Sequence, residues 1–229
     1  MMKPLGSLLA LMAVCAAPAL AANPVRISQI YGGGGNTTGT PTYKEDYIEV
    51  YNSGDVAVDI GGWWLQYGTT NGLWASAPNQ AVQFPLGTTI QPCQYMLVLT
   101  YGGSAFLGSS LLFRCDFAFA GPNMSATSGK VLLSTAANFS VACGSEVGPV
   151  DMVAYGTSFN CPGTPIAPGL SDQRAAVRND GGNQDTDSGA DFTAVSNPVP
   201  HNSQSTRNPA CLATPTRSTT WGQVKSIYR

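Results

Sequence analysis

The 229-residue chain has 10% charged residues and a formal net charge of −2. Nonspecific nucleic-acid binding needs clustered Lys and Arg to neutralise phosphates, and the sequence has no such cluster, so this partner class is excluded. The low charge, 26 glycines and 16 prolines favour many short strands joined by tight turns over helices.

The N-terminus has the pattern of an export signal. Met1-Met2-Lys3 precedes an apolar run, Leu5–Val14, and Ala19-Leu20-Ala21 supplies the small residues that a signal peptidase reads. Residues 1–21 are therefore predicted to be a signal peptide, and the apolar run is too short to span a bilayer. Lipidation at Cys15 is disfavoured because Val14 stands where a small residue is expected. We expect a secreted or cell-surface protein without a membrane span.

The stretch Tyr47–Tyr67 shows the clearest strand pattern. Ile48 and Val50 alternate with polar and aromatic residues, and turn residues follow. Consecutive Trp63 and Trp64 must point to opposite sides of their strand, so one of them is expected in the core. Further strands are predicted at Val25–Tyr31, Ala81–Phe84, Thr88–Ile90, Tyr95–Thr100, Gly129–Ser134, Val150–Tyr155 and Asp172–Val177.

Two local expectations accompany these strands. Strict alternation in Val25–Tyr31 places Val25, Ile27, Gln29 and Tyr31 on one face. The glycine run Gly32–Gly35 is interpreted as a flexible loop, because no helix and no Gly-Lys-Ser/Thr sequence follow to make a phosphate loop. No helix is expected after the signal, and eight or nine short strands match a β-sandwich.

Five segments occur in an order that carries a family resemblance. They are VRISQIYGGGG, IEVYN followed by VDIGGW, MSATSGKVLL, VDMVAYG and DTDSGADF, within residues 25–210. This order resembles secreted bacterial lamin tail domain (LTD) proteins. The resemblance implies an all-β, immunoglobulin-like sandwich over residues 22–211 and a non-catalytic role. Residues 212–229 are expected to be a linker and a separable tail, Trp221–Arg229, that is either a sorting or anchoring tag or a frayed end.

Removal of the signal leaves five cysteines. Pairing is expected in an oxidising compartment, and the odd number leaves one thiol over. We predict Cys143–Cys161 and Cys93–Cys115 disulfides, since each pair flanks one or two strand-length segments, and an unpaired Cys211. Metal ligation is disfavoured because no Cys-x-x-Cys spacing occurs.

An acidic loop offers a calcium alternative. Asp180, Asp185, Asp187 and Asp191 are hard oxygen ligands in one turn-rich segment. The spacing does not fit an EF-hand, and Asp and Asn commonly cap turns through their own backbone. The capping interpretation is preferred, so no cofactor is expected.

Four aromatic residues are candidates for a binding surface: Trp64, Tyr67, Trp74 and Tyr101. Aromatic faces could stack on a sugar, although packing in the core or under loops is the alternative. Loops 32–42, 68–80 and 101–114 would present such a surface, and Trp74 in the second is expected to be exposed. The expected partner is a cell-surface polysaccharide or a secreted protein.

Support for catalysis is thin. His201 is the only histidine, and its Pro/Asn-rich surroundings predict a solvated side chain. No nucleophile motif accompanies it. The sequence therefore favours a non-catalytic binding or structural module. The alternatives are a carbohydrate-binding module and, less favoured, a hydrolase, which would need a cleft that joins His201 to carboxylates.

Overall fold

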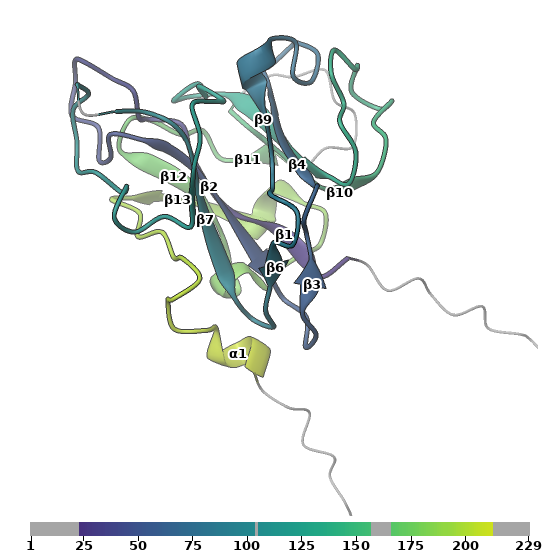
Figure 1. Cartoon of the computed structure of the whole chain (residues 1–229). Helices are drawn as coiled ribbons and strands as arrows, with labels where there is room; N and C mark the ends of the chain where they lie inside the picture. The colour runs from purple at the N-terminus through teal and green to yellow at the C-terminus, as the bar shows by residue number, and fades with distance from the viewer. Residues whose placement is uncertain (1–22, 104, 157–165, 213–229) are drawn as a thin grey trace, which may run out of the picture.

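The computed structural model describes residues 23–103, 105–156 and 166–212 (Figure 1). The predicted signal peptide, Cys161 and the tail from Ala213 lie outside these residues. Within them the chain forms an immunoglobulin-like β-sandwich, as predicted.

One layer is a six-stranded sheet and the other is five-stranded. The six-stranded sheet has the order β13 (Phe192–Ser196), β12 (Arg174–Arg178), β1 (Val25–Tyr31), β2 (Asp46–Asn52), β7 (Tyr95–Tyr101), β8 (Phe117–Ala118). The five-stranded sheet has the order β11 (Ile166–Ala167), β10 (Pro149–Tyr155), β9 (Gly129–Ser134), β4 (Trp64–Gly68), β5 (Ala81–Gln83). A short pair, β3 (Val58–Asp59) and β6 (Thr89–Ile90), completes the strands that the structure describes.

The main core fills the space between the two large sheets. Ile48 and Val50 of β2 lie in it as predicted, opposite Leu65 of β4 and Val131 and Leu133 of β9, and all five are fully buried. Burial of these apolar side chains is the main source of stability, at roughly 25 cal/mol per Å² removed from water.

The alternation predicted for β1 is wrong beyond Ile27. A β-bulge shifts the register there, so that Ile27 pairs with Val50 while Gln29 pairs with Glu49. The extra residue, Ser28, reverses the faces that follow it. Ile30 therefore joins Val25 and Ile27 in the main core, and Gln29 and Tyr31 turn to the outer face.

The glycine run after β1 is not a flexible loop over its first three residues. Gly32, Gly33 and Gly34 are buried. A Cβ on Gly34 would lie 2.3 Å from the Asp46 nitrogen and from the Glu45 carbonyl carbon. Glycine is required there because two backbone segments touch.

The expectation of no helix is also wrong. Helix α1 (Pro209–Leu212) follows the last strand, and single 3-10 turns occur at Pro78–Gln80, Asp180–Gly182 and Gly189–Asp191. Strands β8, β11 and β13 were not predicted, because each is short or follows polar turn residues. No helix in the described part of the chain is long and apolar enough to cross a membrane.

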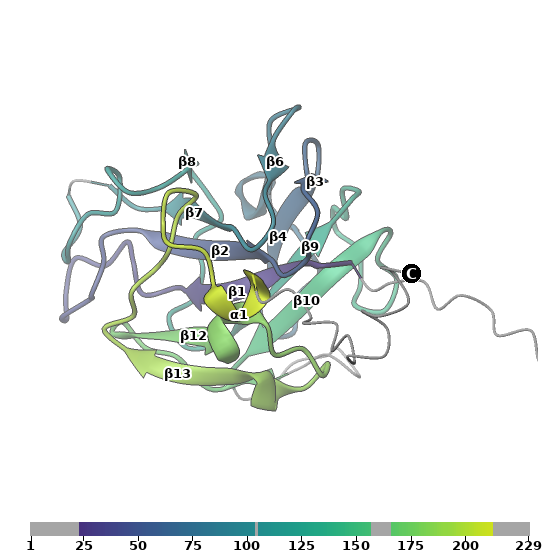
Figure 2. The ribbon, with the colours of Figure 1, turned by 90° about the horizontal axis from the view of Figure 1, so that it is seen from below.

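The C-terminal residues form a strap over the six-stranded sheet. We define the strap as residues 197–212, which leave β13, run across the outer side of β2 and β7 and end in α1 (Figure 2). Tyr43 donates a hydrogen bond to the Pro198 carbonyl at 2.6 Å, and Gln29 donates one to the Val199 carbonyl at 3.2 Å. The outer side of β2 and β7 is thereby covered by the chain itself (Figure 2).

Asp46 at the start of β2 is fully buried, and this burial predicts a pH dependence of stability. Burial raises the pKa of this carboxyl to about 7, although the backbone amides of Met124 and Gly34 donate to it. The folded protein therefore keeps this proton when the unfolded chain has already lost it. Stability should fall as pH rises from about 4 to about 7. Asp46 is not alone in this range, because burial also raises the pKa of Asp151, although Arg178 opposes the shift; Asp151 therefore adds to the fall in stability above pH 3.8.

Two further groups contribute outside this pH range. The pKa of His201 is raised, so its contribution is complete below 6.5 and is lost as pH rises through the folded pKa. The pKa of Asp191 is lowered to about 2, so its contribution is lost below 3.8. Urea unfolding against pH should show greatest stability near pH 4–5. Asp46→Asn should flatten the fall between pH 4 and 7, whereas the exposed Asp180→Asn should not. An unchanged slope in Asp46→Asn would contradict the assignment.

Candidate functional site

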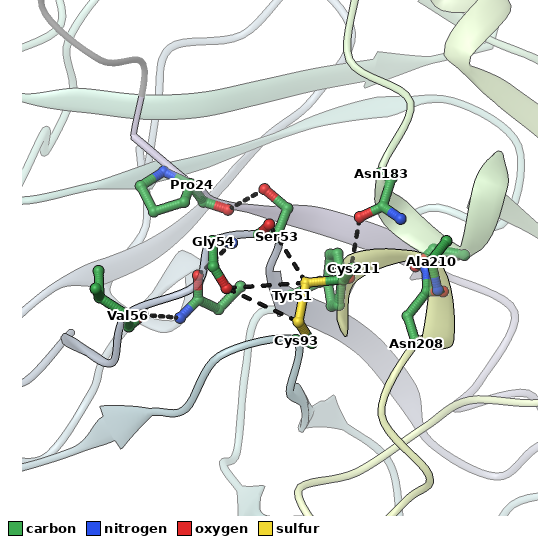
Figure 3. The surroundings of a disulfide bond; sticks show 12 residues. Pro24, Tyr51, Ser53, Gly54, Val56, Cys93, Asn183, Asn208, Ala210 and Cys211 are labelled. Carbon is green, nitrogen blue, oxygen red and sulfur yellow. Dashed lines mark hydrogen bonds between the residues drawn. A yellow bond between two sulfur atoms is a disulfide. The ribbon is translucent and has the colours of Figure 1, made fainter. Parts of the chain in front are cut away.

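The strap is fixed at its far end by a disulfide. Cys93, in the turn before β7, bonds to Cys211 of α1 with an S–S distance of 2.02 Å and a sequence separation of 118 residues (Figure 3). The Cys211 sulfur lies 3.4 Å from the Ser53 carbonyl oxygen. The predicted Cys93–Cys115 pair and the unpaired Cys211 are therefore wrong, because the strap returns to β7 and brings two distant cysteines together.

Among the cysteines that the structure describes, the free thiol belongs to Cys115 instead. Its side chain is half-buried, and burial raises its pKa. Cys143 is disulfide-bonded, but its predicted partner Cys161 lies outside the described residues, so that pairing stays a prediction.

The predicted aromatic surface is not assembled. Trp74 is fully buried and Tyr67 is 2% exposed, so neither can stack on a ligand. Trp64 is half-buried and meets Phe139 edge-on at 5.3 Å, while Trp63 packs against the main core, so the two tryptophans do point to opposite sides. Tyr101 is the last residue of β7, in the other sheet, and its ring centroid lies 5.7 Å from that of Phe106.

Trp74 fills a small core outside the five-stranded sheet. It packs with Leu132, Val141 and Met152, and its indole nitrogen donates to Glu146 at 2.5 Å. The Lys130 ammonium lies 4.8 Å from the ring centroid, a cation–π contact. The expected exposure of Trp74 is wrong, since its loop folds back onto β9.

Two acidic-loop side chains are engaged as hydrogen-bond and ion-pair partners. Asp185 pairs with Arg178 at 3.0 Å and Arg26 at 3.3 Å. Burial opposes ionisation of Asp191, but hydrogen bonds from Thr186, Ser188 and Gln184 outweigh it and lower its pKa to about 2. Asp180 and Asp187 do not converge with them: among the described residues, no three His, Cys, Asp or Glu side chains are grouped to hold a metal ion.

His201 is not simply solvated, because it lies against buried Glu49. Its backbone amide donates to Glu49 Oε2 at 2.5 Å and its Nδ1 lies 3.3 Å from the same atom. The ring stacks on Tyr95 with centroids 4.6 Å apart. The hydrogen bond to Glu49 raises the pKa of His201, although burial opposes this. His201 thus links the strap to β2 and β7.

A small cavity adjoins this contact, but its geometry does not suit hydrolysis. Its volume is about 30 Å³, and its lining includes Ser28, Glu49, Tyr95, Arg178 and His201. That is room for one or two waters. Ser28 Oγ donates at 2.6 Å to Glu49, not to the histidine that would have to activate it. Ser28 is also only 2% exposed, so no substrate could reach it.

A second feature, residues 110–116, presents apolar side chains to solvent; we call it the presenting turn. Leu111 N–H and Ser110 Oγ donate to the buried Glu45 carboxylate at 2.9 and 2.8 Å. The Leu111 side chain is 1% exposed, in a cluster with Tyr31 and Tyr47. The Arg114 amide returns to the Leu111 carbonyl at 2.8 Å and closes the turn.

The two residues at the tip point away from the protein. Phe113 is 99% exposed and Leu112 is 50% exposed. Residues 101–115 contain no acidic residue and one Arg, Arg114. Two adjacent large apolar side chains, held outward by a buried anchor, are the kind of exposed patch that marks an interaction site.

The loop 101–114 was predicted to present a binding surface through Tyr101, but its exposed apolar residues are Leu112 and Phe113. Leu112 and Phe113 continue an apolar triplet after Leu111, and nothing in that pattern tells which member is buried. The role of Glu45 had no sequence signal, because its partners lie 65 and 66 residues away.

Comparison with known proteins agrees with this architecture. The lamin tail domain family model matches residues 18–156. A solved structure of a DUF4876 family protein from Bacteroides thetaiotaomicron VPI-5482 aligns with a TM-score of 0.55 at 14% identity, covering 79% of this chain and 73% of that chain. At this identity the likeness concerns the fold alone. No curated protein matches the chain. Because the family model spans more than half of the sequence, the chain belongs to the lamin tail domain family.

Proposed function

We propose that this protein is an exported, non-catalytic binding module that engages another exported protein through Leu112 and Phe113 of the presenting turn. The observation that carries the proposal is the exposure of Phe113 on a turn whose neighbours are held by Glu45 and Leu111. A fixed turn loses little conformational entropy on binding, so most of the contact energy appears as affinity.

A protein partner suits this tip better than a polysaccharide. Leu112 and Phe113 project into solvent from the tip of a turn. Sugar stacking uses flat aromatic faces instead, and the faces of Trp74 and Tyr67 are buried. An apolar side chain entering a pocket of a partner is a common source of binding energy. The Cys93–Cys211 disulfide supports export, because such bonds persist in oxidising compartments.

The absence of catalysis is part of the same proposal. His201, the one histidine, is hydrogen-bonded to Glu49, and the Ser28 hydroxyl beside it donates its hydrogen bond to the same carboxylate. The adjoining cavity of about 30 Å³ is too small for a substrate.

Phe113→Ala is expected to weaken the partner complex about 10- to 100-fold, since burying a Phe side chain contributes roughly 1.5–3 kcal/mol. The matched control is Leu86→Ala, which removes another exposed apolar side chain, 89% exposed. Both variants should unfold at the wild-type denaturant concentration. Retention of exported proteins on the immobilised mature chain, followed by titration of the retained partner, measures the effect. Retention of a polysaccharide instead, or equal weakening by both variants, would contradict the proposal.

A further inference from the structure

The strap reaches the presenting turn in the middle of its course. Asn202 Nδ2 donates to the Arg114 carbonyl at 2.7 Å. Ser203 donates to the Asp116 carboxylate from its backbone amide at 2.9 Å and from its hydroxyl at 2.5 Å. Asp116 also accepts the Leu97 amide at 2.8 Å. The C-terminal half of the turn is therefore held between β7 and the strap.

The strap is anchored on both sides of this contact. Before it, His201 bonds to Glu49. Beyond it, Thr206 and Arg207 are exposed, and the next anchors are Asn208, whose amide donates to the Asp180 and Gly181 carbonyls at 3.0 Å, and the disulfide. The Cys93–Cys211 bond is the covalent attachment of this far end (Figure 3).

We propose that the strap is a disulfide-locked brace that holds the presenting turn in its binding geometry, so that reduction of Cys93–Cys211 lowers affinity for the partner. This regulation rests on the proposed function. Its physical basis is local: without the bond, the segment that carries Asn202 and Ser203 opens more often, and the Arg114 carbonyl and Asp116 lose their partners during each opening.

The chemical step is thiol–disulfide exchange with a dithiol reductant. One reductant thiolate attacks the sulfur of Cys211, which is half-buried while Cys93 is 1% exposed, and Cys93 leaves as a thiolate. The second reductant thiol then displaces Cys211 from the mixed disulfide. The two electrons and two protons pass to the cysteines, which become thiols, and the reductant becomes a disulfide.

Amide hydrogen exchange of the full mature chain tests the brace without a partner. In the Cys93→Ser, Cys211→Ser variant, the amides of Arg114, Cys115 and Asp116 should exchange at least about tenfold faster than in the wild-type protein. Because this variant could be too unstable to fold, Asn202→Ala with Ser203→Ala provides a second one with the disulfide intact. Thr206→Ala with Arg207→Ala, in the same strap, is the matched control and should exchange like wild type.

The outcomes separate the brace from its use. Wild-type exchange in the turn of the Asn202→Ala, Ser203→Ala variant would overturn the brace. If the Cys93→Ser, Cys211→Ser variant exchanges faster in the presenting turn but retains the partner as well as the wild-type protein does, the proposed regulation is overturned. If the wild-type chain retains no exported protein, the proposed function fails, and the exchange rates still decide whether the brace exists.

Discussion

Replacing Cys93 and Cys211 by serine is expected to lower the free energy of unfolding by about 4–5 kcal/mol. The bond joins residues 118 positions apart, and in the chain-entropy model a closed loop of this size restricts the unfolded chain by about that amount. Equilibrium unfolding in guanidinium chloride measures the loss.

Cys115→Ser is the control for this measurement, because it also replaces a cysteine sulfur by a hydroxyl oxygen but breaks no disulfide. It should shift stability by less than about 1 kcal/mol. A double variant no less stable than Cys115→Ser would show that the Cys93–Cys211 bond adds nothing to the stability of the fold.

Trp74→Ala should destabilise the protein by about 3–5 kcal/mol, the range for truncating a large buried aromatic residue. Trp74 is fully buried, and its loss would empty the small core beside Leu132 and remove the hydrogen bond to Glu146. Trp74→Phe keeps most of the packing but not that hydrogen bond, so it should cost distinctly less. Denaturant unfolding provides both values.

Phe113→Ala provides the comparison between an exposed aromatic residue and the buried Trp74. The Phe113 side chain is 99% exposed, so its truncation should leave unfolding within about 0.5 kcal/mol of wild type. Near-wild-type stability of Trp74→Ala would mean that its loop is not packed as the structure has it.

The strands could be predicted because alternation is local. Ile48 and Val50 fill the core as their spacing indicated, and β1 and β9 have the predicted bounds. The faces of β1 could not be predicted beyond Ile27, because one inserted residue at Ser28 reverses them and leaves no mark in composition. Local pattern determines where strands occur more than which neighbours they meet.

The candidate site depended on long-range contacts and was largely missed. Cys93 finds Cys211 only because the strap crosses the sheet, and short sequence separation favoured the wrong partner. Trp74 lies in a loop outside the predicted strands, so no alternation pattern indicated that this loop folds back and buries it. His201 and Glu49 lie 152 positions apart, and neither residue indicates the other.

The most direct test of the account is photo-crosslinking from the tip of the presenting turn. A photoreactive phenylalanine analogue at position 113 of the full-length chain should give one dominant adduct with an exported protein. The same analogue at position 86, where Leu86 is 89% exposed, should give none. Adducts of equal yield at the two positions, or a dominant adduct at 86, would contradict binding through Phe113.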